Sequence, residues 1–207
     1  MKKYKTFIKS IAIMLGYQGT VYFLIKEFQS GFHILNSFLK VPLLKGFVYC
    51  YDVWYPFILL CAFIVFYNDK ENYKKLIYTM VIATIMSEIT FLVYPTMVIR
   101  PEISINSLTD FVLYITYKLD SPAVNCLPSV HCLYCFITSF YIITSKNLKT
   151  IYKVLICMFS LSIVLSTIFI HQHIIEDAFL SLAYTSLTIF LVYLFKDKIK
   201  KVLKFMF

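Results

Sequence analysis

The chain has 207 residues, of which 60% are hydrophobic and 18% aromatic, with a mean hydropathy of +0.76 and a formal net charge of +9. A water-soluble domain of this length is closer to half apolar and could not bury so many aromatic side chains in one core. The basic residues form short clusters between apolar runs, and no nucleic-acid-binding motif accompanies them, which argues against DNA or RNA as a partner. The composition therefore predicts an all-α protein embedded in a membrane.

Six apolar runs are each close to the roughly 17–25 residues that a membrane-spanning helix needs. They cover Phe7–Ile25, Tyr51–Tyr67, Tyr73–Tyr94, Ser129–Thr144, Ile151–Ile170 and Ile174–Phe195, the fourth being the shortest. No Ala-x-Ala cleavage site follows the first run, which is therefore expected to be a retained helix. No linker or repeat divides the runs, so residues 1–207 are expected to form a single integral membrane domain, a bundle of six transmembrane helices.

The distribution of basic residues predicts how the bundle is oriented. If both termini lie on one side of the membrane, that side carries fifteen of the twenty Lys and Arg residues and the opposite side carries five. Cytoplasmic segments of membrane proteins are enriched in Lys and Arg. The sequence thus predicts a multi-pass protein of the cell membrane with both termini in the cytoplasm.

Two outer segments carry apolar residues at helical spacing. These residues are Phe28, Phe32, Leu35 and Leu39 in the first segment, and Leu108, Phe111, Val112 and Ile115 in the second. Ser107, followed three residues later by Asp110, is a plausible helix start for the second segment. Such a stripe either lies flat among the lipid headgroups or packs on the neighbouring spans.

The six cysteines give little indication of a metal site. Cys132 and Cys135 are three residues apart, but no second pair accompanies them, so zinc is not expected. Cys50 and Cys126 both fall near the predicted outer face, where a disulfide is possible. The other cysteines are expected to act as small apolar residues in the core.

The residues best suited to chemistry lie in three outer segments. Arg100 follows the third span and precedes Pro101; a guanidinium offers a planar fork of donors that suits phosphate, although basic residues at span ends also simply reach the headgroups. Ser129 and His131 open the fourth span after Pro128. Free N–H groups at a helix start bind anions, and a histidine there can give a proton to a leaving oxygen, but an ordinary capped helix start would look the same.

The third segment contains His173 and Asp177 at the start of the sixth span. Four residues apart, they share one face of a helix, so the carboxylate can fix one ring nitrogen and leave the other free to attack. The alternative is a pair that binds metal or only satisfies itself. An ionisable pair at the top of a span is costly, which favours a functional role.

In combination, Arg-Pro at 100–101, Pro-Ser-x-His at 128–131 and His-x-x-x-Asp at 173–177 resemble the type 2 phosphatidic acid phosphatase (PAP2) superfamily. The motif region covers about residues 94–177, and Asn-Cys-Leu-Pro-Ser at 125–129 and Gln-His at 172–173 resemble the bacterial branch near inositol-phosphorylceramide-synthase-type enzymes. The resemblance implies a PAP2-like bundle with an outward-facing active site that needs no metal or other cofactor.

The resemblance also implies a role for each motif residue. His173 corresponds to the nucleophile, Asp177 to the residue that orients it, His131 to the general acid, and Arg100 and Ser129 to phosphate ligands. Three positions depart from the pattern, because Val93, Val130 and Thr167 stand where the family usually has Lys, Gly and Arg. His171 or Lys118 is expected to supply part of the missing positive charge at the phosphate. Glu88 is expected either to pair with Arg100 or to reach water.

These features predict a membrane lipid phosphatase that hydrolyses a lipid phosphate monoester or diphosphate through a phosphohistidine. The substrate would be a phospholipid or a polyprenyl phosphate, and the sequence predicts no particular oligomeric state. One alternative is a phosphotransferase that moves a phospho-headgroup between lipids. Another is a non-catalytic relative that binds phospholipid, or a small transporter.

Overall fold

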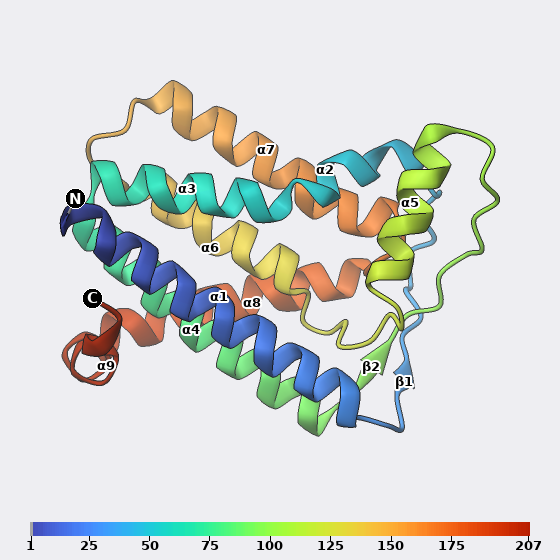
Figure 1. Ribbon diagram of the computed structural model, residues 1–207, viewed down its shortest axis with the longest axis horizontal. Helices are drawn as coiled ribbons and strands as arrows, with labels where there is room; N and C mark the ends of the chain where they lie inside the picture. The colour runs from blue at the N-terminus through green and yellow to red at the C-terminus, as the bar shows by residue number, and fades with distance from the viewer. Residues whose placement is uncertain (1) are drawn as a thin grey trace.

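The computed structural model describes residues 2–207 and is almost entirely helical, as the composition predicts (Figure 1). The elements in chain order are α1 (Lys2–Phe28), β1 (His33–Ile34), η1 (Lys45–Phe47), α2 (Val48–Asp52), α3 (Trp54–Asn68), α4 (Lys70–Val93), β2 (Thr96–Met97), α5 (Leu108–Leu119), α6 (Val130–Thr144), α7 (Thr150–Phe169), α8 (Ile175–Leu194), α9 (Lys196–Val202) and η2 (Leu203–Met206). Each predicted span coincides with one of α1, α3, α4, α6, α7 and α8 to within a few residues.

Within residues 2–207, four helices are long and apolar enough to cross a membrane, namely α1, α4, α7 and α8. A fifth span is formed if Lys45–Asp52 and Trp54–Asn68, which are bent by 40° at their junction, count together. The helix α6 has only 15 residues, because it begins after Pro128 and ends before the turn at Ser145. The structure therefore supports a multi-pass membrane protein with four or five spans by this measure, fewer than the six predicted.

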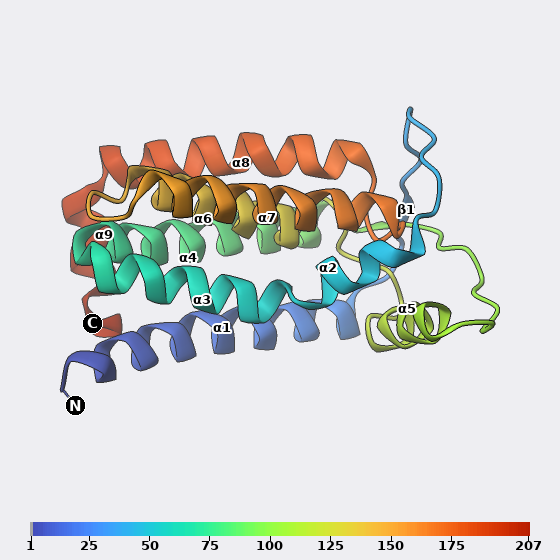
Figure 2. The same cartoon turned by 90° about the horizontal axis from the view of Figure 1, so that it is seen from above.

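The long helices run side by side, and both termini lie at the same end of the bundle (Figure 1). The strands β1 and β2 and the helix α5, which lies across the bundle, are all at the opposite end (Figures 1 and 2). The helix α6 packs against α3, α4, α7 and α8. Its side chains Leu133, Tyr134, Ile137 and Tyr141 are completely buried. Large apolar side chains on the outer helices are exposed instead, as for Leu161 of α7, and this is the surface expected to face lipid.

Polar side chains inside the bundle are paired between helices. Thr79 and Thr84 of α4 lie 2.7 Å from the hydroxyls of Tyr141 and Tyr134 of α6. Each threonine hydroxyl also donates to a carbonyl of its own helix. Such interhelical hydrogen bonds hold helices together where lipid provides no hydrophobic driving force between them. They fix α6 against α4, and so fix the position of the residues at the start of α6.

The predicted start of α5 is confirmed. Ser107 caps the helix, because its hydroxyl accepts a hydrogen bond from the Asp110 backbone N–H at 3.1 Å. Leu113 is buried against Val48 and Ile170, whereas Leu108 is 73% exposed. The apolar residues of α5 thus cover two faces, one packed on the bundle and one open.

The first outer segment is not a helix, and that prediction was wrong. Gly31 adopts a left-handed conformation (φ 75°) just after α1 ends at Phe28, and this breaks the helical course. The chain then runs parallel to residues 96–97, with His33 opposite Thr96. The backbone N–H of Leu35 donates to the carbonyl of Met97 at 2.8 Å. Pairing with β2 therefore replaces the expected amphipathic helix.

The six cysteines are all free, so the possible disulfide between positions 50 and 126 is absent.

Candidate functional site

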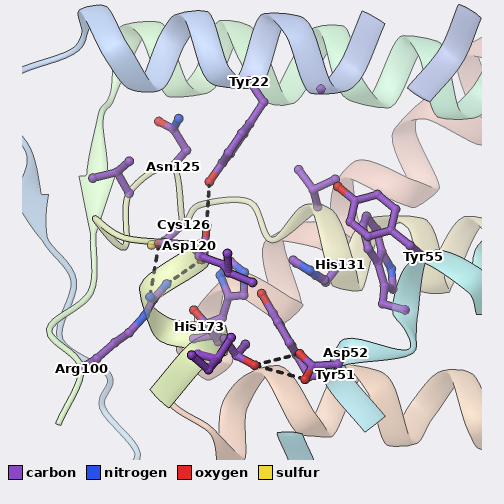
Figure 3. Close-up of a pocket in the computed structure, with 18 of the residues that line it drawn as sticks. Tyr22, Tyr51, Asp52, Tyr55, Arg100, Asp120, Asn125, Cys126, His131 and His173 are labelled. Atoms are coloured by element: carbon purple, nitrogen blue, oxygen red, sulfur yellow. Dashed lines mark hydrogen bonds and ion pairs between the residues drawn. The ribbon is translucent and has the colours of Figure 1, made fainter. Parts of the chain in front are cut away.

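A cavity of about 560 Å³ lies at the end of the bundle that carries α5. Its wall is formed by the second half of α1, the junction of α2 and α3, one face of α5, the loop before α6 and the turn between α7 and α8. Figure 3 shows that Arg100, His131 and His173 approach this cavity from three different segments of the chain. The predicted convergence of the three motif segments on one place is therefore present in the structure.

The turn between α7 and α8 fixes His173. The backbone N–H groups of Gln172 and His173 both donate to the carbonyl of Thr167 at 3.0 Å, which folds the chain back after α7. The ring Nδ1 of His173 lies 3.0 Å from Oδ2 of Asp177, and the same oxygen accepts the backbone N–H of Ile174 at 3.1 Å. With Nδ1 donating to the buried carboxylate, Nε2 is the ring nitrogen left with a free lone pair. This arrangement is suited to a nucleophile.

The ring of His131 lies between two aromatic side chains. Its centroid is 4.6 Å from that of Tyr51, stacked at 28°, and 4.3 Å from that of Trp54. The centroid of His173 is 5.9 Å away. The helix start also contributes, since Ser129 accepts the N–H of Cys132 and so fixes the first turn of α6. The two imidazoles are thus neighbours at the cavity wall, close enough for one to act as a proton donor and the other as a nucleophile in the same reaction.

Arg100 is held by the end of α5. It donates to Oδ2 of Asp120 at 2.6 Å and to the backbone carbonyls of Tyr117 and Asp120 at 3.2 and 3.3 Å. The guanidinium also lies over the Tyr117 ring at 5.0 Å, and burial raises the pKa of that phenol to about 12. Lys26 of α1 approaches the other Asp120 oxygen at 3.8 Å. An arginine paired in this way is fixed in position, and an anion in the cavity would compete with Asp120 for it.

The structure does not bring every predicted site residue to the cavity wall. His131, His173 and Arg100 line the wall, and Asp177 lies behind His173. Ser129 is fully buried, and its hydroxyl serves as the helix cap. His171, in a left-handed conformation (φ 53°), is not among the residues described as lining the cavity, and its Nε2 lies 3.1 Å from the carbonyl of Val41.

The structure also places two other charged residues differently from what the sequence predicted. Glu88 is buried and accepts a hydrogen bond from Tyr17 at 2.6 Å, and the described carboxylate partner of Arg100 is Asp120. Both expectations for Glu88, a pair with Arg100 or contact with water, were therefore wrong. Lys118 points over the Tyr114 ring and lines a second hollow on the outer side of α5. The cation nearest to the Arg100 pair is Lys26, which the sequence had not singled out.

Sequence reasoning missed four residues that shape the site. Asp120 fixes Arg100, and Tyr51 packs on His131. Asn125 and Gln172 line the cavity with buried amides. Asn125 and Gln172 fall inside the motif segments, which was the available signal, whereas nothing in the sequence distinguishes Asp120 from other loop carboxylates.

Within residues 2–207, no group of three or more His, Cys, Asp or Glu side chains is arranged to hold a metal ion. Comparisons with models of protein families, with curated proteins and with solved structures found no match to this chain. The function has therefore to be argued from the geometry of the site.

Proposed function

We propose that the chain is a lipid phosphatase of the PAP2 type that hydrolyses a phosphate monoester or diphosphate of a membrane lipid. The observation that carries the proposal is the common cavity of His173, His131 and Arg100, which come from three distant segments. A guanidinium and two imidazoles around one small volume suit phosphoryl transfer, which depends mainly on positioning and on charge stabilisation.

The reaction would proceed in two balanced steps. In the first step, Nε2 of His173 attacks phosphorus, the bond from phosphorus to the lipid oxygen breaks, and His131 donates its proton to that oxygen. In the second step, water attacks the phosphohistidine, the phosphorus–nitrogen bond breaks, and His131 takes a proton from the water. Asp177 keeps the His173 ring in the required tautomer, and Arg100 binds the phosphate oxygens.

The membrane arrangement that accompanies this proposal has six spans, with α2–α3 as a broken span and α6 as a short one. Fifteen of the twenty Lys and Arg residues belong to the end with the termini, and five belong to the end with the cavity. By the enrichment of basic residues in cytoplasmic segments, the termini are cytoplasmic and the cavity faces outward. Apolar side chains at the mouth of the cavity, such as Phe23 and Leu119, suit the acyl or polyprenyl chain of a substrate.

The test uses purified full-length protein with phosphatidic acid and polyprenyl diphosphate, and it measures phosphate release. We expect turnover by the wild type, loss of at least about a thousandfold in the His173→Ala variant, and a phosphohistidine trapped in a rapid quench. Full turnover by His173→Ala would refute the mechanism. Transfer to an added alcohol in place of water would identify a phosphotransferase, and lipid binding with no product would identify a non-catalytic relative.

A further inference from the structure

Asp52, the last residue of α2, brings a carboxylate to the cavity, and none of the ion pairs described within residues 2–207 involves it. The residue is exposed, and its two oxygens lie 3.0 and 3.1 Å from the hydroxyl of Thr116 on α5. That hydroxyl also lies 3.0 Å from the carbonyl of Val112. A hydroxyl has one proton to donate, whereas a carboxylate has room for about four donors. The Asp52 carboxylate therefore keeps most of its accepting capacity for a ligand.

The position of Asp52 relates it to the two histidines of the proposed reaction. Figure 3 shows its side chain extending from the junction of α2 and α3 toward α5, beside Tyr51. The ring centroid of Tyr51 is 4.6 Å from that of His131, and the His131 centroid is 5.9 Å from that of His173. All four residues line the same cavity. A headgroup whose phosphate lies at His173 can therefore present a second group to Asp52.

The charged side chains on the cavity wall do not balance one another. Among the residues described as lining the cavity, Arg100 is the one Lys or Arg, and Asp52 and Asp120 are both carboxylates. Arg100 compensates Asp120 at 2.6 Å, and Lys26 adds to this at 3.8 Å. Asp52 is left as negative charge, and a bound phosphate adds charge of the same sign. Because like charges repel more strongly where water is partly excluded, a ligand with its own positive charge suits this wall better than a simple anion does.

Aromatic side chains around the cavity favour a particular kind of cation. Tyr22 of α1 lines the cavity, together with Tyr51, Trp54 and Tyr55 from the junction of α2 and α3. The faces of aromatic rings attract ammonium groups, and a carboxylate nearby adds a charge-assisted hydrogen bond or an ion pair. A metal ion fits less well, since residues 2–207 contain no group of three or more His, Cys, Asp or Glu arranged to hold one.

We propose that Asp52 binds an ammonium group of the same substrate whose phosphate lies at Arg100 and His173. The substrate class is then a zwitterionic lipid, in which a primary or quaternary ammonium is joined to the phosphate through a short alkyl chain. This inference rests on the proposed function for the position of the phosphate, and it adds the chemistry of the headgroup. Two sources share this chemistry: an amino alcohol phosphate carries the ammonium on the tail side of the phosphate, and a phosphodiester headgroup carries it beyond the phosphate.

The experiment uses pairs of soluble probes that differ in one positive charge. Phosphocholine is compared with neohexyl phosphate, in which carbon replaces the quaternary nitrogen, and phosphoethanolamine is compared with propyl phosphate. Binding to the purified full-length protein is measured by calorimetry at low ionic strength. The wild type is expected to bind the charged member of at least one pair about three- to tenfold more tightly, a modest preference because Asp52 is exposed. Equal affinities within both pairs would overturn the inference without the need for any variant.

Asp52→Asn tests the carboxylate directly, because it removes the charge and keeps an oxygen that can accept the Thr116 hydrogen bond. It is expected to bring the affinities within each pair to within about twofold, through weaker binding of the charged probe alone. The matched control is Asp110→Asn, since Asp110 is paired with Lys45 at the same end of the bundle and is not among the residues described as lining the cavity. This control is expected to keep the wild-type preference, and equal losses in the two variants would contradict a specific role for Asp52.

Thr116→Val separates ligand binding by Asp52 from a structural role in holding α5. The change removes the hydrogen bond between α2 and α5 and leaves the carboxylate charged. Thermal unfolding is expected at a lower temperature, with the preference for the charged probes retained. If the preference depends on Thr116 as strongly as on Asp52, the carboxylate acts by positioning α5, and the inference is overturned. If Asp52→Asn does not fold, the comparison of probes on the wild type still decides.

Two short-chain lipids distinguish the sources of the ammonium, and they separate this inference from the proposed function. Dihexanoyl phosphatidylethanolamine and a medium-chain amino alcohol phosphate each compete with phosphocholine, and the lipid whose competition weakens in Asp52→Asn identifies the source. Competition that is independent of Asp52 for both lipids would contradict the inference. If the charged probes depend on Asp52 but no lipid is turned over, the proposed function fails and the inference stands. If lipid phosphate is released and the probes show no preference for charge, the inference fails and the proposed function stands.

Discussion

The two ends of the bundle differ in the polar groups that they bury, although buried hydroxyls without a partner, such as that of Ser145, also occur near the termini. In the half near the termini, Tyr73 pairs with Ser10 at 2.6 Å, and Tyr141 pairs with Thr79 at 2.7 Å. At the cavity end, the amides of Asn125 and Gln172 and Nε of Arg100 have no partner. Polar pairs that satisfy each other stabilise the helices, whereas groups left open lower stability and are retained where a ligand uses them. The half of the bundle near the termini thus serves as a structural frame, and the proposed site lies at the opposite end.

The largest effect is expected from His131→Asn at the cavity end. Loss of the proton donor is expected to lower the rate of phosphate release about 10²- to 10⁴-fold. Binding of inorganic phosphate should change less than the rate, because Arg100 and His173 remain. The matched control is His33→Asn, since His33 is an exposed histidine that stacks on Tyr94 outside the cavity wall. Equal losses in the two variants would contradict a specific role for His131.

The next test releases Arg100 from its partner. In Asp120→Asn, phosphate no longer competes with a carboxylate, so phosphate affinity is expected to rise about three- to tenfold. The gain is modest because the Asp120 side chain is 35% exposed and the pair is partly screened by water. Thermal unfolding should occur at a lower temperature, since Asp120 also contacts Lys26 and Tyr22 of α1. Weaker phosphate binding would show that Asp120 helps to hold the anion.

The frame is tested with Tyr141→Phe. The change removes the hydrogen bond with Thr79 and leaves Thr79 with its carbonyl acceptor at Lys75, so the expected cost is about 1 kcal/mol of unfolding free energy. Turnover at a temperature well below unfolding should be unchanged. A loss of turnover without a loss of stability would mean that the two halves are coupled.

The smallest effect on stability is expected from Asp110, in the first turn of α5. Hydrogen bonds from the Lys45 ammonium and the Ser107 hydroxyl lower the pKa of this carboxyl from its ordinary value of 3.8. A lowered pKa in the folded state gives stability that is present above the unfolded pKa and lost as the pH falls through the folded pKa. The Asp110→Asn variant should therefore be less stable than the wild type at neutral pH. The difference should begin to shrink as the pH falls to about the ordinary value of 3.8 and disappear once the pH is below the lowered pKa of the folded state. A difference that does not vary with pH would rule out this ion pair as its source.

The helices were predictable because each has a local cause. An apolar run between polar ends specifies α4 or α8 without reference to any other segment, and Ser107 with Asp110 specifies the start of α5. The parallel pairing of His33 with Thr96 was not predictable, since a two-residue pairing across sixty residues leaves no periodic pattern. Gly31 was the one local signal against a helix there.

The candidate site shows the same difference between local features, which could be predicted from the sequence, and contacts between distant segments, which could not. The sequence predicted the bond between His173 and Asp177, which the structure contains at 3.0 Å, but not its cause. His173 lies in the turn before α8, and Asp177 reaches back from the first turn of α8 to the His173 ring and to the Ile174 N–H. The sequence predicted both His171 and His173 at the phosphate, but of the two only His173 lines the cavity, because His171 has a left-handed conformation in the turn. The partner of Arg100 was equally hidden, since Asp120 follows it by twenty residues and approaches through the fold of α5.

The shortness of α6 has a consequence for how a lipid would reach His131. A helix of 15 residues rises only about 22 Å, whereas the 24 residues of α4 rise about 36 Å. Figure 1 shows that the first turn of α6 lies further into the bundle than the ends of α7 and α8 near α5. In the proposed reaction, the phosphate of a lipid would therefore have to move below the plane of the surrounding headgroups to reach His131. If the chain is the proposed phosphatase, lipids with small headgroups are expected to be better substrates than lipids with bulky glycan headgroups.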